Sequence, residues 1–160
     1  TLTTDKSIKL FEKFHIFTQA ELESRAEILY ETYAKTINIE ALTMIDMTSK
    51  QIVPAVIRYT KMLADSVIAV KSAGGDSSVA TEMLQKITLK LRETQNAESA
   101  LIDAEEKASS MPQGKNQAFY YRNSVVNAME SLRKPADELE KMVDKEYWPF
   151  PTYADLIFEV

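Results

Sequence analysis

The side chains of this chain that could carry chemistry are few, and the first pattern to weigh is Glu12-Lys-Phe-His15. Helical bundles build two-iron carboxylate sites from Glu-x-x-His pairs on two helices. His15 is the single histidine, so a second pair cannot form, and its place beside Phe14 and Ile16 favours a structural role. The same count argues against Ser-His-Asp triads and zinc sites. A phosphotransfer histidine stays open as an alternative.

The carboxylates give a second candidate. Glu23, Glu27 and Glu31 recur every fourth residue and therefore share one helix face, as a cation site would require. A solvated helix face explains the same spacing more simply. Glu40 and Asp46 lie six residues apart on different faces of a straight helix, so they do not form a general acid and base pair.

The sequence also gives little support for a nucleotide-binding or phosphate-binding site. Neither Gly74-Gly75 nor Gly114 stands in a strand-to-helix frame with the Lys-Ser/Thr of a phosphate loop. Tyr120-Tyr121-Arg122 could hold a phosphate or stack on a base, but one inward-facing tyrosine with outward neighbours is the simpler interpretation. We therefore predict no catalytic residue, no cofactor and no metal ion in this chain.

Composition limits the class of protein. The chain has 160 residues, 45% hydrophobic side chains, a net charge of −5, a pI near 5.0 and no cysteine. This length suits one domain over residues 1–160, and the acidic balance argues against a nucleic-acid partner. The sequence has no signal peptide, no apolar run long enough to span a bilayer and no Met before Thr1. We expect a soluble piece of a longer chain in a reducing compartment.

Glycine positions divide the chain. They predict two turns between three long helical segments, and a shorter helix from Asp5 to Phe14 precedes these. Thr18-Gln-Ala-Glu21 has the form of a capping box and predicts the start of the first long helix. The predicted fold class is all-α: an antiparallel bundle of three long helices, a short N-terminal helix and an extended aromatic and proline-containing C-terminal tail.

Two prolines fall inside these helical patterns. If unbroken from Thr18 to Ala73, the first long helix would span roughly 80 Å at about 1.5 Å per residue. Pro54 predicts a kink near residues 50–54, or a break. Pro135 predicts a kink or a restart in the last helix. The segment that begins at Asp76-Ser77-Ser78 has the most diluted apolar stripe, which predicts the least stable helix.

The last residues form the most specific segment. Residues 146–160, Glu-Tyr-Trp-Pro-Phe-Pro-Thr-Tyr-Ala-Asp-Leu-Ile-Phe-Glu-Val, combine two prolines with five aromatic side chains. The prolines forbid helix locally, so we predict an extended docking tail. Its first part is expected to anchor on the chain's own helices through Tyr147, Trp148 and Phe150. Its second part is expected to form an interface with another part of the protein through Tyr153, Leu156, Ile157 and Phe158.

Three segments carry a resemblance to a known family. They are this tail, Lys35-Thr-Ile-Asn-Ile-Glu-Ala-Leu-Thr-Met-Ile-Asp-Met47 and Ser7-Ile-Lys-Leu-Phe-Glu-Lys13. Together they resemble the C-terminal region of type III glutamine synthetases, over residues 7–61 and 120–158, while residues 64–111 are not matched. Ala154 stands where a glycine would be expected.

The resemblance implies a role without catalysis. Glutamine synthetases join ammonia to glutamate with ATP and divalent metal ions, and none of the family's catalytic motifs is present here. The parent enzyme is implied to be a cytoplasmic ligase of nitrogen metabolism, while this C-terminal domain alone is expected to be inactive. Its implied partners are the catalytic part of the same polypeptide and neighbouring subunits of a homo-oligomer, with no nucleic acid and no membrane. The alternative is a freestanding helical interaction or phosphotransfer module with an aromatic docking tail.

Overall fold

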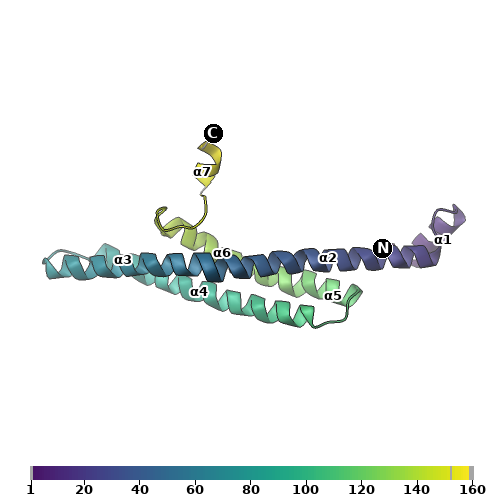
Figure 1. Cartoon of the computed structure of the whole chain (residues 1–160), viewed down its shortest axis with the longest axis horizontal. Coiled ribbons are helices and arrows are strands. Elements are labelled where there is room, and N and C mark those ends of the chain that lie inside the picture. The colour runs from purple at the N-terminus through teal and green to yellow at the C-terminus, as the bar shows by residue number, and fades with distance from the viewer. Residues whose placement is uncertain (1, 152, 159–160) are drawn as a thin grey trace.

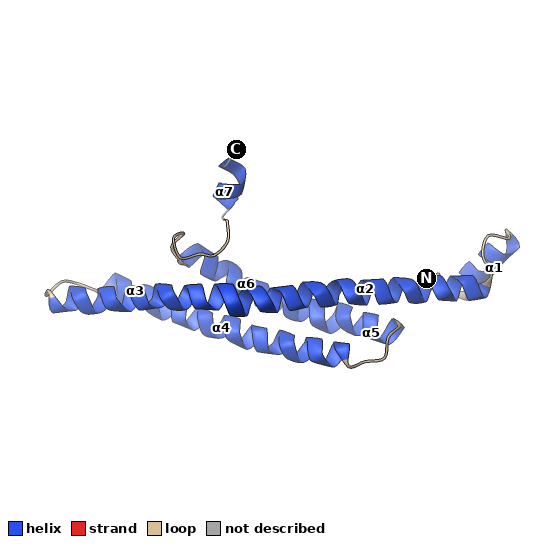
Figure 2. Ribbon diagram, viewed as in Figure 1, coloured by secondary structure: helices blue, strands red, loops and turns tan. Residues whose placement is uncertain are grey.

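The computed structural model describes residues 2–151 and 153–158, and within them it contains helices and connecting turns but no strand (Figures 1 and 2). The all-α prediction is confirmed. The three apolar stripes and the scarcity of glycine explain this result, because each stripe gives a helix one face to bury.

The short N-terminal helix α1 spans Asp5–Lys13. Thr4 caps its first turn, and His15 adopts a left-handed φ of 52° just after its end, which lets the chain turn into the next helix. The rings of Phe11 and Phe17 pack across this turn with centroids 5.7 Å apart. No residue of α1 is fully buried, and Leu10 within the helix and Phe14 just after it are exposed.

Helix α2 spans Gln19–Met47 and begins with the predicted capping box. The backbone N–H of Thr18 donates to the Glu21 carboxylate at 2.7 Å, and the N–H of Glu21 donates to the Thr18 hydroxyl at 3.4 Å. The prediction of a helix start at Thr18 is confirmed, because two otherwise unpaired backbone donors are satisfied there.

Helix α2 continues without a break through a π-helical turn, η1 (Thr48–Ile52), into α3 (Val53–Ser72), as the long rod in Figure 1 shows. The N–H of Val53 donates to the carbonyl of Thr48, five residues back. Pro54 follows at the start of α3, where a missing N–H is tolerated. The region of the predicted kink is therefore a wide turn, in which the helix makes room for the proline ring.

The chain reverses at Gly74, whose φ of 77° suits glycine. Helix α4 (Ser78–Ser109) then runs back along α3 and α2 and packs also against the last helices. Asp76 caps it, because its carboxylate accepts from the N–H of Ser78 at 2.9 Å; Ser77, the residue at the N-cap position, makes no side-chain cap.

A second reversal at Gly114 leads into α5 (Lys115–Tyr120), a second π-helical turn η2 (Tyr121–Val125) and α6 (Val126–Met142). Pro135 is buried inside α6, and the helix passes through it, so the predicted restart there is wrong. The packing of α6 along α4 holds the helix together where one backbone hydrogen bond is missing.

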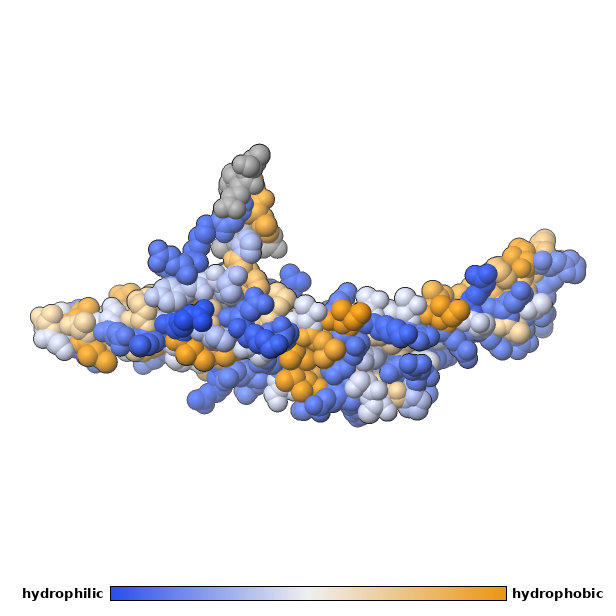
Figure 3. All heavy atoms as spheres, in the orientation of Figure 1, coloured by the Kyte–Doolittle hydropathy of each residue, from blue (hydrophilic) through white to orange (hydrophobic). Residues whose placement is uncertain are grey.

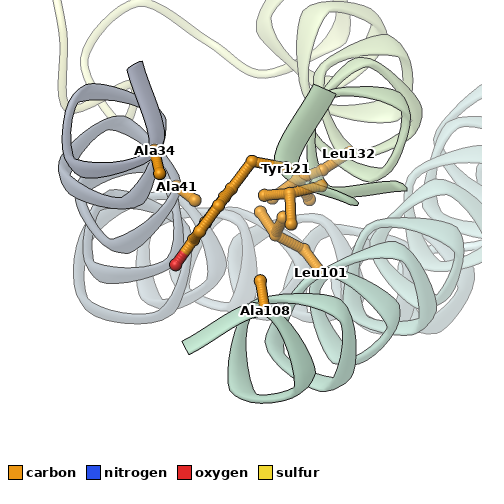
Figure 4. Packing of buried hydrophobic residues seen from close by; sticks show 7 residues of the cluster. Ala34, Ala41, Leu101, Ala108, Tyr121 and Leu132 are labelled. Carbon is orange, nitrogen blue, oxygen red and sulfur yellow. The ribbon is translucent and has the colours of Figure 1, made fainter. Parts of the chain in front are cut away.

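The core consists of two clusters along the rods. The first joins α2, α4, η2 and α6, and Figure 4 shows its side chains converging between these helices. The second joins η1, α3, α4 and α6. The first contains Ala34, Ala41, Leu101, Ala108, Tyr121, Val125 and Leu132, and the second contains Ile52, Val56, Tyr59, Leu63, Ile87, Leu139 and Val143.

The segment after α6 corrects the predicted extended tail. Residues 153–158 form a short helix, α7 (Tyr153–Phe158), so the prediction of an extended arm is wrong over this range. The proline effect ends at Pro151, and the Tyr-Ala-Asp-Leu-Ile-Phe stretch that follows contains no breaker and has Asp155 in its first turn. Figure 1 shows α7 projecting away from the long rods.

Candidate functional site

Metal-binding groups and membrane-spanning helices are both absent from the part of the chain that is described. In residues 2–151 and 153–158, no group of three or more His, Cys, Asp or Glu side chains is placed to hold a metal ion. None of the described helices is both long and apolar enough to cross a bilayer. His15 is exposed at the turn after α1.

Two of the three carboxylates that share this face of α2 have protein partners. Glu23 accepts a hydrogen bond from the Gln19 amide at 2.7 Å, and Glu31 pairs with Lys35 at 2.6 Å. Glu23 and Glu27 are exposed. These contacts fit the interpretation of a solvated face.

Tyr120, Tyr121 and Arg122 face in different directions. The side chain of Tyr121 is buried, with 2% exposed, whereas Arg122 is exposed. The ammonium of Lys107 lies 5.4 Å from the centroid of the Tyr120 ring. The arrangement agrees with a single inward tyrosine and does not bring the three side chains together around a phosphate.

Tyr121 instead joins a polar cluster with the half-buried Asn38 and the buried Glu105. The Asn38 amide donates to the Glu105 carboxylate at 2.6 Å and to the Tyr121 hydroxyl at 3.1 Å. Glu105 is only 8% exposed. Figure 4 shows the tyrosine reaching from η2 across to α2, with its hydroxyl oxygen next to that helix. A polar cluster is costly to bury unless its members satisfy one another, so these contacts tie α2, α4 and η2 into one register.

Two pKa values reflect this interior. Burial raises the pKa of Tyr121, and the nearby Glu105 carboxylate raises it further, while the hydrogen bond from Asn38 acts in the opposite direction. Burial also raises the pKa of Glu98, which lies on the same helix as Glu105. Both shifts follow from the cost of holding a charge away from water.

The aromatic residues after α6 pack on the second core cluster. Tyr147, Trp148 and Phe150 all contact it, and the ring of Tyr147 lies with its centroid 5.4 Å from that of Tyr59. The rings of Trp148 and Phe150 meet edge to face at 6.3 Å. Burial, Asp144 and Tyr147 together raise the pKa of Tyr59. The structure therefore places the predicted anchor residues on the chain's own helices.

The predicted interface residues lie on α7. Leu156 is 69% exposed and Ile157 is 63% exposed, and apolar atoms are visible on this projecting helix in Figure 3. An ion pair between Lys145 and Asp155 joins α7 to the segment after α6. Tyr153 and Phe158 belong to α7, but their side chains lie outside the described residues.

Comparison with known proteins identifies the class. Residues 1–71 match the family model of the glutamine synthetase C-terminal domain. It is similar to the C-terminal part of a glutamine synthetase from Butyrivibrio fibrisolvens, with 36% identity over 159 residues, and of the type-3 glutamine synthetase of Dictyostelium discoideum, with 29% identity over 167 residues. The resemblance to the C-terminal region of type III glutamine synthetases is thereby confirmed.

The coverage of these alignments is unequal. Each of the two includes 98% of this chain but only 23% and 22% of the relatives, so the chain spans less than a quarter of their length. A glutamine synthetase of Bacteroides fragilis (strain YCH46) is 28% identical over 149 residues, which cover 89% of the chain and 20% of that protein. Because 98% of the chain is aligned, the segment 64–111 also falls within the region of similarity.

The sequence interpretation missed Asn38 and Glu105. Glu105 stands four residues after Leu101 and three before Ala108, on the buried stripe of α4. A charged residue in an apolar stripe was the available signal. The partner could not be read from the sequence, because Asn38 lies 67 residues away.

Proposed function

We propose that this chain is the non-catalytic C-terminal domain of a type III glutamine synthetase, in which an antiparallel bundle of three long helical rods supports the catalytic part or the contacts between subunits. In this proposal the partners are the remainder of the same polypeptide and neighbouring subunits of a homo-oligomer in the cytoplasm. ATP and divalent metal ions bind the parent enzyme outside this domain.

The observation that carries the proposal is the division of the C-terminal segment into two parts. Tyr147, Trp148 and Phe150 cover the second core cluster, whereas Leu156 and Ile157 are exposed on a helix that projects from the rods. Two adjacent large apolar side chains exposed on a projecting helix cost solvation free energy, which a partner surface recovers by covering them. In this proposal the residues after α6 anchor the segment on the bundle, and α7 contacts the partner surface.

The test is made in the complete enzyme. Leu156→Ser combined with Ile157→Ser should weaken subunit assembly, measured by sizing and analytical ultracentrifugation at several protein concentrations. Ile68→Ser is a matched control, since Ile68 is 64% exposed on α3 and outside the tail. We expect the control to assemble normally. If the double variant assembles like the control, the tail is not the interface.

Truncation gives an independent measure. Removal of the residues after Pro151 should weaken assembly of the complete enzyme more than it lowers the melting temperature of the isolated chain, because the anchoring aromatics remain. If the truncation lowers the melting temperature of the isolated chain and leaves assembly of the complete enzyme unchanged, then α7 packs on its own bundle and the interface lies elsewhere.

The non-catalytic role has its own test. The purified 160-residue chain should neither hydrolyse ATP nor form glutamine, measured by phosphate release and by γ-glutamyl transfer with Mg²⁺ or Mn²⁺ present. Turnover that survives purification to constant specific activity would refute this role and leave the assembly proposal untouched.

A further inference from the structure

A small aromatic cleft opens on the surface between α2 and α5. It has a volume of about 160 Å³ and is lined by Tyr30, Tyr33, Ala118, Phe119 and Arg122. The rings of Tyr30 and Phe119, one from each helix, lie with their centroids 6.4 Å apart. A cavity of about 150 Å³ is large enough for one benzene ring, so the cleft suits a single aromatic or branched aliphatic side chain.

The aromatic cleft has large apolar side chains at its surface. Phe119 is 44% exposed and Tyr33 is 37% exposed. Leu29 stands four residues before Tyr33 on the same face of α2 and is 58% exposed, so it extends the apolar surface by one helical turn. Large apolar side chains that lie together in water favour a partner that covers them.

Two cations border the aromatic cleft. Arg122 lines it, and the ammonium of Lys115 lies 5.9 Å from the centroid of the Phe119 ring. Neither cation forms a salt bridge with any residue that the structure describes. Lys115 also lines a neighbouring hollow that contains Glu27 and Glu31, so Arg122 gives the cleft most of its positive charge. An apolar segment that carries carboxylates fits this combination.

The C-terminal segment of the same chain has the matching properties. Leu156 and Ile157 are exposed on α7, and the spacing of residues 153, 156 and 157 places these three positions on one helix face. The sequence of residues 153–160 contains two carboxylates and no lysine or arginine. The segment therefore combines branched aliphatic side chains with negative charge, which is the chemistry that the aromatic cleft fits.

Helix α7 cannot reach the aromatic cleft of its own chain. Phe150 packs on the second core cluster, and Ile52 is the member of that cluster closest to the cleft along the α2–α3 rod. Ile52 lies 19 residues after Tyr33, or about 28 Å at about 1.5 Å per residue. Even full extension from Phe150 to residue 153, followed by one turn of α7, takes Leu156 only about 15 Å beyond Phe150. Figure 1 shows α7 leaving the rods at a different part of the bundle from α5.

We propose that the aromatic cleft receives α7 of a second copy of this chain, with Leu156 or Ile157 between the rings and the carboxylates of residues 153–160 near Arg122. The inference rests on the proposed function, because it takes α7 as the contact between subunits and adds the surface that α7 contacts. Every copy carries both the helix and the cleft. Two copies related by a twofold axis would therefore exchange their α7 helices and cover both clefts.

Cross-linking between copies tests the assignment directly, because the chain has no cysteine of its own. Leu156→Cys chains are mixed with Tyr33→Cys chains that carry a size tag, and the mixture is treated with a short bis-maleimide. Each chain has one cysteine, so the mixed product always joins two copies. We expect this product to form at least about tenfold faster than with tagged Ile68→Cys chains, since Ile68 is exposed on α3 outside the cleft. Equal rates with the two tagged chains would overturn the proposal.

Sedimentation of the complete enzyme separates this inference from the proposed function. Arg122→Glu should weaken assembly about three- to tenfold, while the control Arg58→Glu, the same charge change at an exposed position of α3, should not. If the Leu156→Ser and Ile157→Ser double variant weakens assembly but Arg122→Glu behaves like Arg58→Glu, then α7 contacts another surface and only this inference fails. If the mixed cross-link forms as expected but the double variant assembles normally, the contact between α7 and the cleft stands and the proposed role in assembly fails.

Discussion

The π-helical turn η1 precedes Pro54 and also sets which side chains of the long helix face the core. The stability effect of the proline and that of the packing can therefore be tested with separate variants. A π-turn closes hydrogen bonds over five residues where an α-turn uses four, so it holds one extra residue without rotating the helix on either side. The buried residues before it, such as Ala41, and after it, such as Val56, both pack on the partner helices. Their faces are aligned because the extra residue is accommodated at residues 48–52.

Pro54→Ala should therefore change the free energy of unfolding by less than about 1 kcal/mol. The restored N–H can gain a hydrogen bond worth about 0.5–1.5 kcal/mol, while the more flexible unfolded chain costs about 0.4–1 kcal/mol. Both terms are small beside the roughly 3 kcal/mol of a proline forced into a regular helix interior. Pro54 avoids that penalty because it stands at the start of α3 after a wide turn.

Deletions test the reasoning more sharply. Deleting Lys50, which is exposed, in the Pro54→Ala background removes the extra residue and should leave both packed faces in place, at a cost of about 1 kcal/mol or less relative to Pro54→Ala. Deleting the exposed Glu40 instead rotates the preceding helix by about 100°. It should cost about 3–6 kcal/mol, from the lost burial of Ile37 and from leaving Glu105 without Asn38.

The assay is urea denaturation of the purified chain, followed by circular dichroism at several urea concentrations. Stabilisation by Pro54→Ala approaching 3 kcal/mol would show that the wide turn is a strain imposed by the proline. Equal losses from the two deletions would show that the extra residue has no special place in the packing. Either result would refute the account of η1.

Further predictions concern single side chains and are measured by thermal or urea denaturation. Thr18→Ala should cost about 1 kcal/mol, because the hydroxyl that accepts from the backbone N–H of Glu21 is lost, and an unchanged midpoint would mean that the first turn frays freely. Leu139→Ala, at a fully buried position, should cost about 2–5 kcal/mol, whereas Leu156→Ala at a 69% exposed position should cost less than about 0.5 kcal/mol in the isolated chain. Glu98→Gln should raise the melting temperature at pH 7: burial raises the pKa of this carboxyl, so stability is lost as pH rises from the ordinary value of 4.5 through the folded pKa. The gain should disappear below pH 4.5, and a gain of the same size at both pH values would exclude ionisation as its cause.

Local signals in the sequence determined the helical character of the chain and several of its boundaries. The apolar stripes, the capping box at Thr18 and the glycine turns act between residues that are close in the chain, so their physical effect can be read without knowing the partners. The resemblance of the C-terminal segment to type III glutamine synthetases likewise depended on residue order alone.

The tertiary structure decided how the helices accommodate their proline residues and which polar residues pack together. Helix α6 continues through Pro135 because packing along α4 outweighs one missing hydrogen bond. The wide turn before Pro54 accommodates the proline and keeps the residues of both core clusters on the buried face of the helix. Asn38, Glu105 and Tyr121 meet only because α2, α4 and η2 lie side by side. Contacts between residues 67 and 83 positions apart depend on the packing of whole helices, and neither local propensity nor periodicity carries that information.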